Sequence, residues 1–515
     1  AIYVEDVIYF INSGCWFVRN SAVRWGGAIY SEDVNFLFTT NSTFTFNKAE
    51  FGGGIYLRSL KFVARNTWCM FANNRVHGAA AAMKIINGKQ TSKIFILHSQ
   101  FKDNTFLGHG ATNLEGADII VHSHCIYMNN TGKLQAGALS MHNANNITNR
   151  NCLFHSNSAN GNADFSNGGA ILMDHIAYFT EYNCSFINNS ATMEGGAVHL
   201  STIKLYLSVM SYYADNFAGK AGGALWCKDS GRVRLTLDTF ISNNVITSGG
   251  ALFAEKISLD NNRCYFRNNT SHEGGAIMLL NVKELKNNYC KFISNQAHEL
   301  GGMSVIMSES GEAKISNNFS LFLSNEASYG GTFYIDAAEY LVNLNCKYVS
   351  NTARRRGGAF WAFKMKLLLN FRCNFTKNLA HQYGSVVCLI ETKIVKTFQC
   401  IFKRNLAQSA SLYLHKAEYI LTNCSVFEAN FCDRGGSLHA WHAKCVLNVK
   451  TVFLRNQAQG DSGTVFVNEA DVFYSLQSQY LNNTVSLGGG ACLLKKVNHV
   501  HVTYSLFLGN FAPSR

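Results

Sequence analysis

Residues 186–198 read FINNSATMEGGAV, and residues 213–225 read YADNFAGKAGGAL. Each stretch has an aromatic residue followed three positions later by Asn, and each ends in Gly-Gly, Ala and an aliphatic residue. The second copy lies 27 residues after the first. A repeat of this length has to be traced along the chain before any secondary structure is assigned, because a missed period would misassign the whole fold.

The aromatic–Asn pair recurs from one end of the 515-residue chain to the other. It occurs 19 times, and its Asn positions run from Asn20 to Asn510, so the mean period is about 27 residues. The Gly-Gly motif keeps the same phase, with further copies at Gly26-Gly27 and Gly357-Gly358. Chance does not produce two columns locked to each other over a whole chain.

The length of the repeat and the alternation of apolar residues within it predict strands and not helices. Helical repeats need about 33 residues or more, with apolar positions 3.6 apart. Here every second residue is apolar or small, as in Ala28-Ile29-Tyr30-Ser31, and aromatic and β-branched residues dominate. The sequence therefore predicts an all-β fold, a parallel β-helix (β-solenoid) of about 19 coils. We expect one continuous domain over residues 1–515, part of a longer array or of an end-to-end assembly.

The two motif columns have structural explanations. Gly-Gly allows a turn through positive φ. Asn tolerates the left-handed region at a corner, and stacked Asn amides can hydrogen-bond from coil to coil. We expect the aromatic column to fill the interior as a stack.

The composition fits such a fold. The chain is 47% hydrophobic and 15% charged, which is too apolar for disorder, and no apolar run approaches the length of a transmembrane helix. Its 42 glycines suit corners, whereas its single proline fits a sheet in which nearly every strand is central. The 45 Lys and Arg outnumber the 32 Asp and Glu, and the net charge of +13 favours anionic partners without identifying one.

The motifs GGA[ILV] and FxxN resemble those of the chlamydial polymorphic outer-membrane proteins. The resemblance covers essentially the whole chain. It implies a pectin-lyase-like, right-handed parallel β-helix and a role in adhesion. The chain shows no C-terminal membrane barrel and no secretion signal, so we expect a processed chain or a fragment of a longer array.

Ten of the 16 cysteines share one column, two residues before the aromatic residue, where other repeats have Ser. Such a column favours a small interior residue, and we interpret these cysteines as buried free thiols. Disulfides between adjacent coils stay open as an alternative, although a run of three such as Cys125, Cys152 and Cys184 cannot pair completely. Zinc-type CxxC spacing is absent, so we expect no metal site and no cofactor.

Sequons for N-linked glycosylation are distributed along the chain. Those at Asn129, Asn188, Asn268 and Asn482 directly precede the Asn of the repeat, where strand alternation should turn them outward. The candidate glycosylation sites are Asn41, Asn129, Asn146, Asn183, Asn188, Asn268, Asn318, Asn374, Asn423 and Asn482.

A column of aromatic residues follows the second Gly position by three residues. Its neighbours on both sides are small or apolar, so alternation predicts that the column points outward as an exposed stripe. Such a stripe would suit sugar stacking, a protein partner or lateral assembly. The candidate binding residues are Tyr30, Tyr56, Trp226, Phe253, Tyr334, Trp361, Tyr413 and Phe466.

We expect no catalytic residues. Enzymes on this fold gather Asp with Lys or Arg in one groove, and the sequence shows no paired carboxylates at matched coil positions. Departures from the period mark three loops, at residues 86–90, 158–167 and 308–312, of which the second holds Asn162 and Asp164. The basic run Arg354-Arg355-Arg356 is expected at a solvated corner, with contact to an anionic glycan as the alternative.

The sequence thus predicts a non-enzymatic, extracellular or cell-surface protein with a structural or adhesive role, such as a glycosylated fibre or a surface-array subunit. The alternative is a polysaccharide-degrading lyase or hydrolase on the same scaffold. The expected partners are further copies of the chain, joined end to end or laterally, and glycans or an anionic surface. We expect no nucleic acid, because the aromatic columns are interior, and no transmembrane segment.

Overall fold

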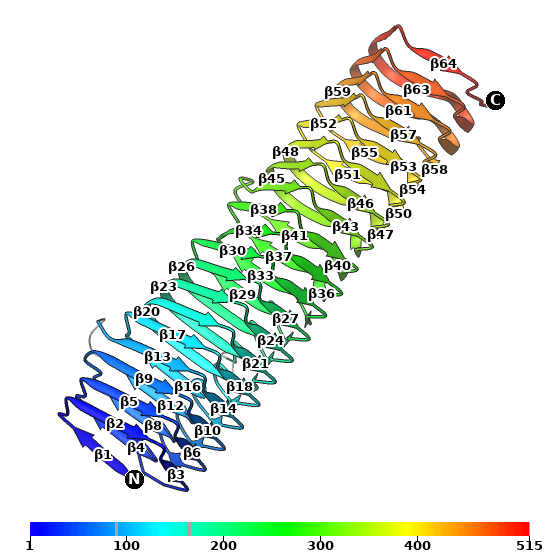
Figure 1. The fold of residues 1–515 in the computed structure, drawn as a ribbon. Coiled ribbons are helices and arrows are strands. Elements are labelled where there is room, and N and C mark those ends of the chain that lie inside the picture. The colour runs from blue at the N-terminus through cyan, green and yellow to red at the C-terminus, as the bar shows by residue number, and fades with distance from the viewer. Residues whose placement is uncertain (88–90, 162–165, 514–515) are drawn as a thin grey trace. The chain divides into compact units, whose positions relative to one another are not determined.

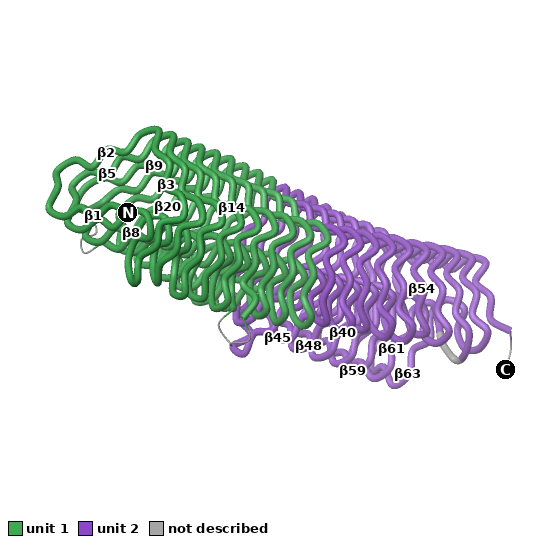
Figure 2. Tube along the Cα trace, turned by 90° about the horizontal axis from the view of Figure 1, so that it is seen from below, with its two compact units in different colours: residues 1–258 green, residues 259–515 purple. Residues whose placement is uncertain are grey.

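The computed structural model describes residues 1–87, 91–161 and 166–513. The chain divides into two compact units, residues 1–258 and residues 259–515 (Figure 2). Within the described residues all regular elements are strands, and no helix occurs that could cross a membrane. The expectation of one continuous domain over residues 1–515 stays a prediction.

Each unit is a parallel β-solenoid, which confirms the predicted fold class (Figure 1). One coil of unit 1 consists of β29 (Leu225–Lys228), β30 (Arg232–Thr236), β31 (Thr239–Ile241) and β32 (Asn244–Val245). The third of these strands belongs to a second sheet, and the other three belong to the first sheet. All of them pair in parallel with the equivalent strand one repeat away, so the sequence motifs set the register.

The second sheet contains one three-residue strand per coil, with nine strands from unit 1 and ten from unit 2 among the described residues. In unit 1 they are β3 (Trp16–Val18), β6 (Thr43–Thr45), β10 (Met70–Ala72), β14 (Gln100–Lys102), β18 (Ile126–Met128), β21 (Leu153–His155), β24 (Ser185–Ile187), β27 (Tyr212–Ala214) and β31. In unit 2 they are β35 (Tyr265–Arg267), β39 (Lys291–Ile293), β43 (Leu321–Leu323), β46 (Lys347–Val349), β49 (Asn374–Thr376), β53 (Ile401–Lys403), β57 (Val426–Glu428), β60 (Val452–Leu454), β62 (Gln479–Leu481) and β64 (Leu506–Leu508).

In some coils the first two strands merge into one long strand. In unit 1 these are β20 (Leu139–Arg150), β23 (Ile171–Tyr182) and β26 (Val198–Val209). In unit 2 they are β45 (Phe333–Leu344), β48 (Phe360–Phe371) and β59 (Leu438–Val449), whereas β61 (Gln457–Leu476) and β63 (Thr484–Thr503) also include the last strand of the preceding coil.

The aromatic column of the repeat forms an interior stack in each unit, as predicted. Neighbouring ring centroids from Phe17 to Phe240 lie 4.5 to 5.0 Å apart in unit 1. In unit 2 the spacing from Phe266 to Phe507 is 4.5 to 5.3 Å. The rings therefore stack at the separation of parallel strands, about 4.8 Å.

The Asn column is a buried hydrogen-bond ladder. Asn189 donates from its backbone N–H and from Nδ2 to Oδ1 of Asn216 on the next coil, at 3.0 and 3.1 Å. Its Nδ2 also donates to the backbone carbonyl of Phe154 at 3.0 Å. The predicted amide stacking is confirmed, and each amide additionally binds the backbone of the adjacent coil.

The expected left-handed backbone lies one residue before the ladder Asn, and not at that Asn. Asn188, Asp215 and Ser242 have φ of 54°, 53° and 53°. The ladder Asn must accept and donate along the coil stack, so the tight bend falls on the exposed residue that precedes it. Asn and Asp are frequent there because they tolerate this region.

Both glycines of the Gly-Gly motif are required by geometry. Gly222 has φ of +66°, where a side chain would be strained. A Cβ on Gly223 would lie 2.1 Å from the carbonyl oxygen of Gly250 on the next coil. The first glycine therefore serves the turn, and the second permits the close approach of neighbouring coils.

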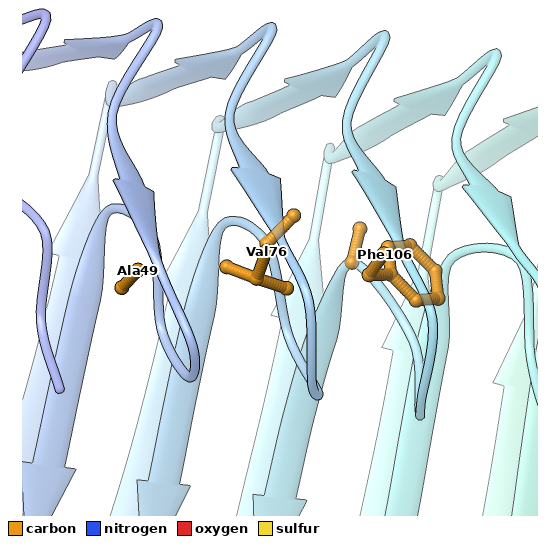
Figure 3. Packing of buried hydrophobic residues seen from close by; sticks show 5 residues of the cluster. Ala49, Val76 and Phe106 are labelled. Atoms are coloured by element: carbon orange, nitrogen blue, oxygen red, sulfur yellow. The ribbon is translucent and has the colours of Figure 1, made fainter. Parts of the chain in front are cut away.

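A small apolar cluster fills the coil where the ladder ends and the Gly-Gly turn begins. Ala49, Val76 and Phe106 occupy this place on successive coils of unit 1 (Figure 3). The coil after Phe106 has Gly132 there, whose Cβ would lie 2.3 Å from the Phe106 ring. Large and small residues on adjacent coils thus compensate each other in volume.

Unit 2 has a second interior Asn ladder that the sequence reasoning missed. Asn261, Asn287, Asn317, Asn343 and Asn370 are joined by Nδ2-to-Oδ1 hydrogen bonds of 2.7 to 2.8 Å. Four of these five residues stand three positions before a cysteine of the Cys column, and this constant offset is the signal that could have revealed them.

The cysteines are free, and the Cys column is buried, except for Cys15 at the first coil, which is half-buried. Cys125, Cys152 and Cys184 follow one another along unit 1. The Cys125 thiol donates to the backbone carbonyl of Ile96 on the preceding coil at 3.1 Å. Burial raises the pKa of Cys152 well above its usual value. These thiols behave as small interior side chains.

Of the three predicted loops, one is described completely. Residues 308–312 form a turn between β41 (Ser304–Met307) and β42 (Lys314–Asn318). Residues 88–90 of the first loop lie outside the described residues, as do Asn162 and Asp164 of the second.

Candidate functional site

The aromatic column that follows the Gly-Gly turn points outward from the coil. The neighbours of its members are buried, as shown by Leu225 and Cys227 on either side of Trp226. The predicted direction is therefore correct. The members lie on the first strand of their coils: Tyr30 on β4 (Ile29–Glu32), Tyr56 on β8 (Ile55–Arg58), Trp226 on β29, Phe253 on β33 (Leu252–Glu255), Tyr334 on β45, Trp361 on β48, Tyr413 on β55 (Leu412–His415) and Phe466 on β61.

The prediction that this column is exposed is wrong for three members. Tyr56, Trp226 and Phe253 are only 7%, 6% and 9% exposed. The others, Tyr30, Tyr334, Trp361, Tyr413 and Phe466, are half-buried. Strand alternation gives the direction of a side chain but does not show what lies above it.

The column is covered because the chain folds back over it just before the Gly-Gly turn. Tyr383 precedes its turn, and its ring centroid lies 4.8 Å from that of Tyr413. In the same way the ring of Tyr329 packs on Trp361 at 6.2 Å. The column therefore lines an inner corner of the coil and not a flat face.

The column is also interrupted. In unit 1, Lys84 takes the place that Tyr56 has on the preceding coil, and the rings return only with His199 and Trp226, which stack at 4.1 Å. In unit 2, Cys388 separates Tyr334 and Trp361 from the next group. The structure therefore shows separate aromatic patches instead of one stripe.

One patch of unit 2 is hollowed, and we call it the aromatic groove. Its cavity has a volume of about 360 Å³. Its residues come from β50 (Leu379–Tyr383), β54 (Leu406–Ser409), β55, β58 (Phe431–Arg434), β59 and β61. The side chains that define it are Tyr383, Gln408, Tyr413, Arg434, His439 and Phe466.

The polar groups of the aromatic groove are few. Arg434 is exposed and forms no ion pair with any residue of the described ranges. His439 is bonded to Ser409 through Nδ1 at 3.3 Å, and burial lowers its pKa to about 4, so that it is neutral at physiological pH. The groove thus offers aromatic faces beside the guanidinium of Arg434, and the Lys495 ammonium lies 5.8 Å from the centre of the Phe466 ring.

The predicted basic cluster contacts the protein itself. Arg354 pairs with Glu326 at 3.2 Å. Arg355 lies over the Tyr329 ring at 5.5 Å and donates to its hydroxyl at 2.8 Å. Arg356 lies over a tyrosine ring as well. Arg354 and Arg355 are exposed, as expected of a solvated corner, and Arg356 is half-buried.

One group of side chains has the chemistry to bind a divalent cation. His272, Glu273 and Glu299 place their ligand atoms within 4.8 Å of one another. The sequence reasoning considered only cysteine spacing and missed them. A His-Glu pair at the same phase of two successive repeats, His272-Glu273 and His298-Glu299, is the signal that could have found them.

Unit 1 contains two buried carboxylates, Glu181 and Asp238, which lie two coils apart and at different positions of the repeat. Glu181 Oε2 accepts from the hydroxyls of Tyr206 and Tyr213 at 2.5 and 2.6 Å. Asp238 Oδ1 accepts from the Ser211 backbone N–H at 2.7 Å. Burial raises the pKa of each carboxyl to about 7. Both side chains are fully buried, so no substrate reaches them.

The candidate glycosylation sites lie at the surface. Asn41, Asn129, Asn146, Asn183, Asn188, Asn268 and Asn482 are exposed. Asn318, Asn374 and Asn423 are half-buried. The four sites that precede a ladder Asn point outward, as alternation predicted.

Comparison with known proteins finds one similarity. No curated protein and no solved structure matches the chain. Residues 183–201 match the family model of the Chlamydia polymorphic membrane protein repeat. The matched stretch includes the Phe186/Asn189 pair and the Gly195-Gly196 turn, which supply the interior stack, the ladder and the tight turn of one coil. The chain therefore carries, at residues 183–201, a repeat of the Chlamydia polymorphic membrane protein type.

Proposed function

We propose that this chain is a non-enzymatic, cell-surface or extracellular repeat protein with an adhesive or structural role, and that its aromatic groove binds a glycan. The match to a surface-protein repeat supports the location. The repeated scaffold supports the role, since rigid solenoids present extended binding surfaces.

The aromatic groove is the observation that carries this proposal. Aromatic rings pack against the C–H faces of sugars, and a guanidinium or amide beside them binds hydroxyl or carboxylate oxygens. Tyr413 and Phe466 supply the rings, and Arg434 and Gln408 supply the polar groups. A cavity of about 360 Å³ accommodates about one or two sugar rings at a time.

The composition of the groove also favours binding over catalysis. Hydrolysis of a glycosidic bond ordinarily uses two carboxyl groups. No carboxylate is found among the described residues that line the aromatic groove. The alternative, a polysaccharide-degrading enzyme, predicts new reducing ends or unsaturated products when the protein is incubated with polysaccharides.

The experiment is a glycan-array screen of the intact protein, followed by titration of the best ligand. Tyr413→Ala should weaken binding by about tenfold, because it removes one ring face worth about 1 kcal/mol or more. Tyr419→Ala is the matched control, since Tyr419 is 50% exposed on β56 (Tyr419–Asn423), outside the groove. Absence of any glycan ligand, or equal loss in both variants, would contradict the proposal.

Glycosylation and self-association belong to the same proposal. Exposed sequons such as Asn129 and Asn188 are accessible to a glycosylating enzyme if the chain passes through a compartment that contains one. A mass decrease on treatment with peptide-N-glycosidase would establish glycosylation. Electron micrographs of end-to-end or lateral assemblies would establish self-association.

A further inference from the structure

A second groove lies on unit 2 at a different corner of the coil, and we call it the lysine groove. It follows the bend between the first two strand segments, as in residues 391–393 between β51 (Val387–Ile390) and β52 (Ile394–Phe398). The bend residue is left-handed in each coil, with φ of 52° at Lys364, 57° at Glu391 and 56° at Lys416. The cavity has a volume of about 600 Å³ and extends over five successive coils.

Lysines dominate this groove. Five of the residues that line it are lysines, and three are glutamates. The pairing of Leu367 with Ile394 puts Lys366 and Lys393 at the same place on adjacent coils, and both are exposed. Like charges opposite each other on neighbouring strands are destabilising, so this arrangement costs stability when no anion is bound.

The glutamates of the groove form their ion pairs with other residues, although Glu418 also lies opposite Lys393 on the next coil. Glu391 pairs with Lys416 at 3.3 Å, and Glu418 pairs with Lys444 at 2.9 Å. Glu469 is contacted by His442 at 2.7 Å.

Three lysines therefore stay unpaired at one end of the groove. Lys366 and Lys393 form no ion pair with a residue of the described ranges, and Lys364 contacts only the Phe363 ring, at 4.7 Å. On the preceding coil, Glu339 pairs with Lys314 at 3.6 Å. The three lysines leave a net positive charge at this end, which Glu339 and Glu418 on the flanking coils reduce but do not cancel.

The floor of the groove carries a further polar atom without a partner. Thr392 lines the cavity between Glu391 and Lys393 and is fully buried. Its Oγ1 has no hydrogen-bond partner within the described part of the chain. Because Thr392 has no exposed surface, a ligand in the groove does not reach this hydroxyl, and the lysines alone carry the binding argument.

We infer that the lysine groove binds an anionic polysaccharide, whose carboxylate or sulfate groups lie between Lys364, Lys366 and Lys393. The groove is open along the coil stack, so a chain can run through it from coil to coil. No Phe, Tyr or Trp lines it for base stacking among the described residues, which disfavours a nucleic acid. A sugar chain with charged groups at intervals fits this pattern of unpaired lysines beside ion pairs.

The test uses the whole chain and a heparin oligosaccharide of defined length as the probe, with titration calorimetry at about 0.05 M and about 0.15 M salt. The triple variant Lys364→Gln/Lys366→Gln/Lys393→Gln should bind about tenfold more weakly or worse, since three charge contacts are lost. The control is Lys291→Gln/Lys347→Gln/Lys377→Gln, which removes the same charge from exposed lysines outside the groove.

The outcomes distinguish binding at the lysine groove from non-specific attraction of a polyanion to a basic protein. Loss in the groove variant alone supports the inference. Equal loss in both triple variants, or no binding at about 0.15 M salt, overturns it. Free sulfate that saturates the same site, or a single-stranded oligonucleotide that binds it as tightly as heparin, overturns the assignment to a polysaccharide. The aromatic groove lies at another corner of the coil, so loss of heparin binding in the groove variant alone is independent of the proposal for the aromatic groove.

Discussion

Raising the pH should destabilise unit 1, because it forces negative charge onto Glu181 in the interior of the coil. Glu181 lies on β23, wholly buried, and its Oε2 accepts hydrogen bonds from Tyr206 and Tyr213. These bonds favour the ionised carboxylate, but burial outweighs them and raises the pKa to about 7. Asp238, nearby and also buried, has its pKa raised to about 7.

The pKa values give the sign and the size of the effect. The pKa of folded Glu181, about 7, lies above its ordinary value of 4.5, so the folded protein holds this proton more tightly than the unfolded chain does. The resulting stability is complete below pH 4.5 and is lost as the pH rises through about 7. For Glu181 alone the difference corresponds to about 3 kcal/mol. Asp238 adds to it, although the two charges interact and their effects do not simply sum.

The assay is the free energy of opening in unit 1 between about pH 5 and about pH 8, from hydrogen exchange of the β23, β26 and β27 amides and from denaturant unfolding. Glu181→Gln keeps the shape and cannot ionise, so it should flatten the pH dependence and stabilise unit 1 at alkaline pH. The variant Glu181→Gln/Asp238→Asn should remove the fall in stability and leave the opposite contribution of buried His122, whose pKa is lowered to about 4 and which makes stability rise with pH up to about 6.5. Glu312→Gln, at an exposed carboxylate of unit 2, is the control.

Two results would refute this reasoning. One is a free energy of opening that falls as steeply with pH in Glu181→Gln/Asp238→Asn as in the unmodified chain. The other is a Glu181→Gln protein that keeps the full slope of the unmodified chain, which would place the titrating group elsewhere.

Three further predictions follow from the ladders and turns. Asn216→Ala removes the acceptor of two buried donors on the neighbouring coil and should lower the free energy of unfolding by about 3 kcal/mol or more in denaturant titrations. Asn188→Gly, at the exposed bend residue, should lower it by less than about 1 kcal/mol, and equal losses in the two variants would contradict the ladder. Gly223→Ala places Cβ 2.1 Å from a carbonyl oxygen of the next coil and should abolish soluble expression or lower the melting temperature by several degrees, and an unchanged melting curve would refute the close approach. Iodoacetamide should label Cys424, the exposed cysteine of the described chain, and spare Cys152 until the protein unfolds; rapid labelling of Cys152 in peptide maps would show that the column is accessible.

The fold was predictable from sequence because each repeat has the same residue types at the positions that determine the turn, the ladder and the interior stack. Nineteen aromatic–Asn pairs at a constant period leave few structures that bring like residues together, and a parallel solenoid is one of them. The position of the left-handed bend was not predictable in this way. An Asn in the sequence is compatible with a left-handed bend and also with a hydrogen-bond ladder. Only the hydrogen bonds of Asn189 to Asn216 and Phe154 show that the ladder Asn binds the neighbouring coils.

The surface was predicted less well, for a physical reason. Alternation along one strand tells which side of the sheet a residue occupies, and this held for Trp226 and Tyr413. Exposure depends on a different segment, the residues before the Gly-Gly turn, which fold over the column through side chains such as Tyr383. The lysine groove and the Glu181/Asp238 pair also combine residues from separate coils. That these residues lie close together can be predicted only when the strand register is known with single-residue precision.

The repeat separates the residues that hold the fold from those that can vary. Interior positions are bound to their counterparts on both neighbouring coils, so a change at Asn216 or Gly223 disturbs three coils at once. Outward positions at the corners have no such constraint, and one column reads Lys366, Lys393, Glu418 and Lys444 on successive coils without any change in the strands beneath. The aromatic groove and the lysine groove both lie at corners of the coil. A binding surface on this scaffold is therefore altered one coil at a time by substitutions in a corner column, with little cost to the stability of the coil that carries it.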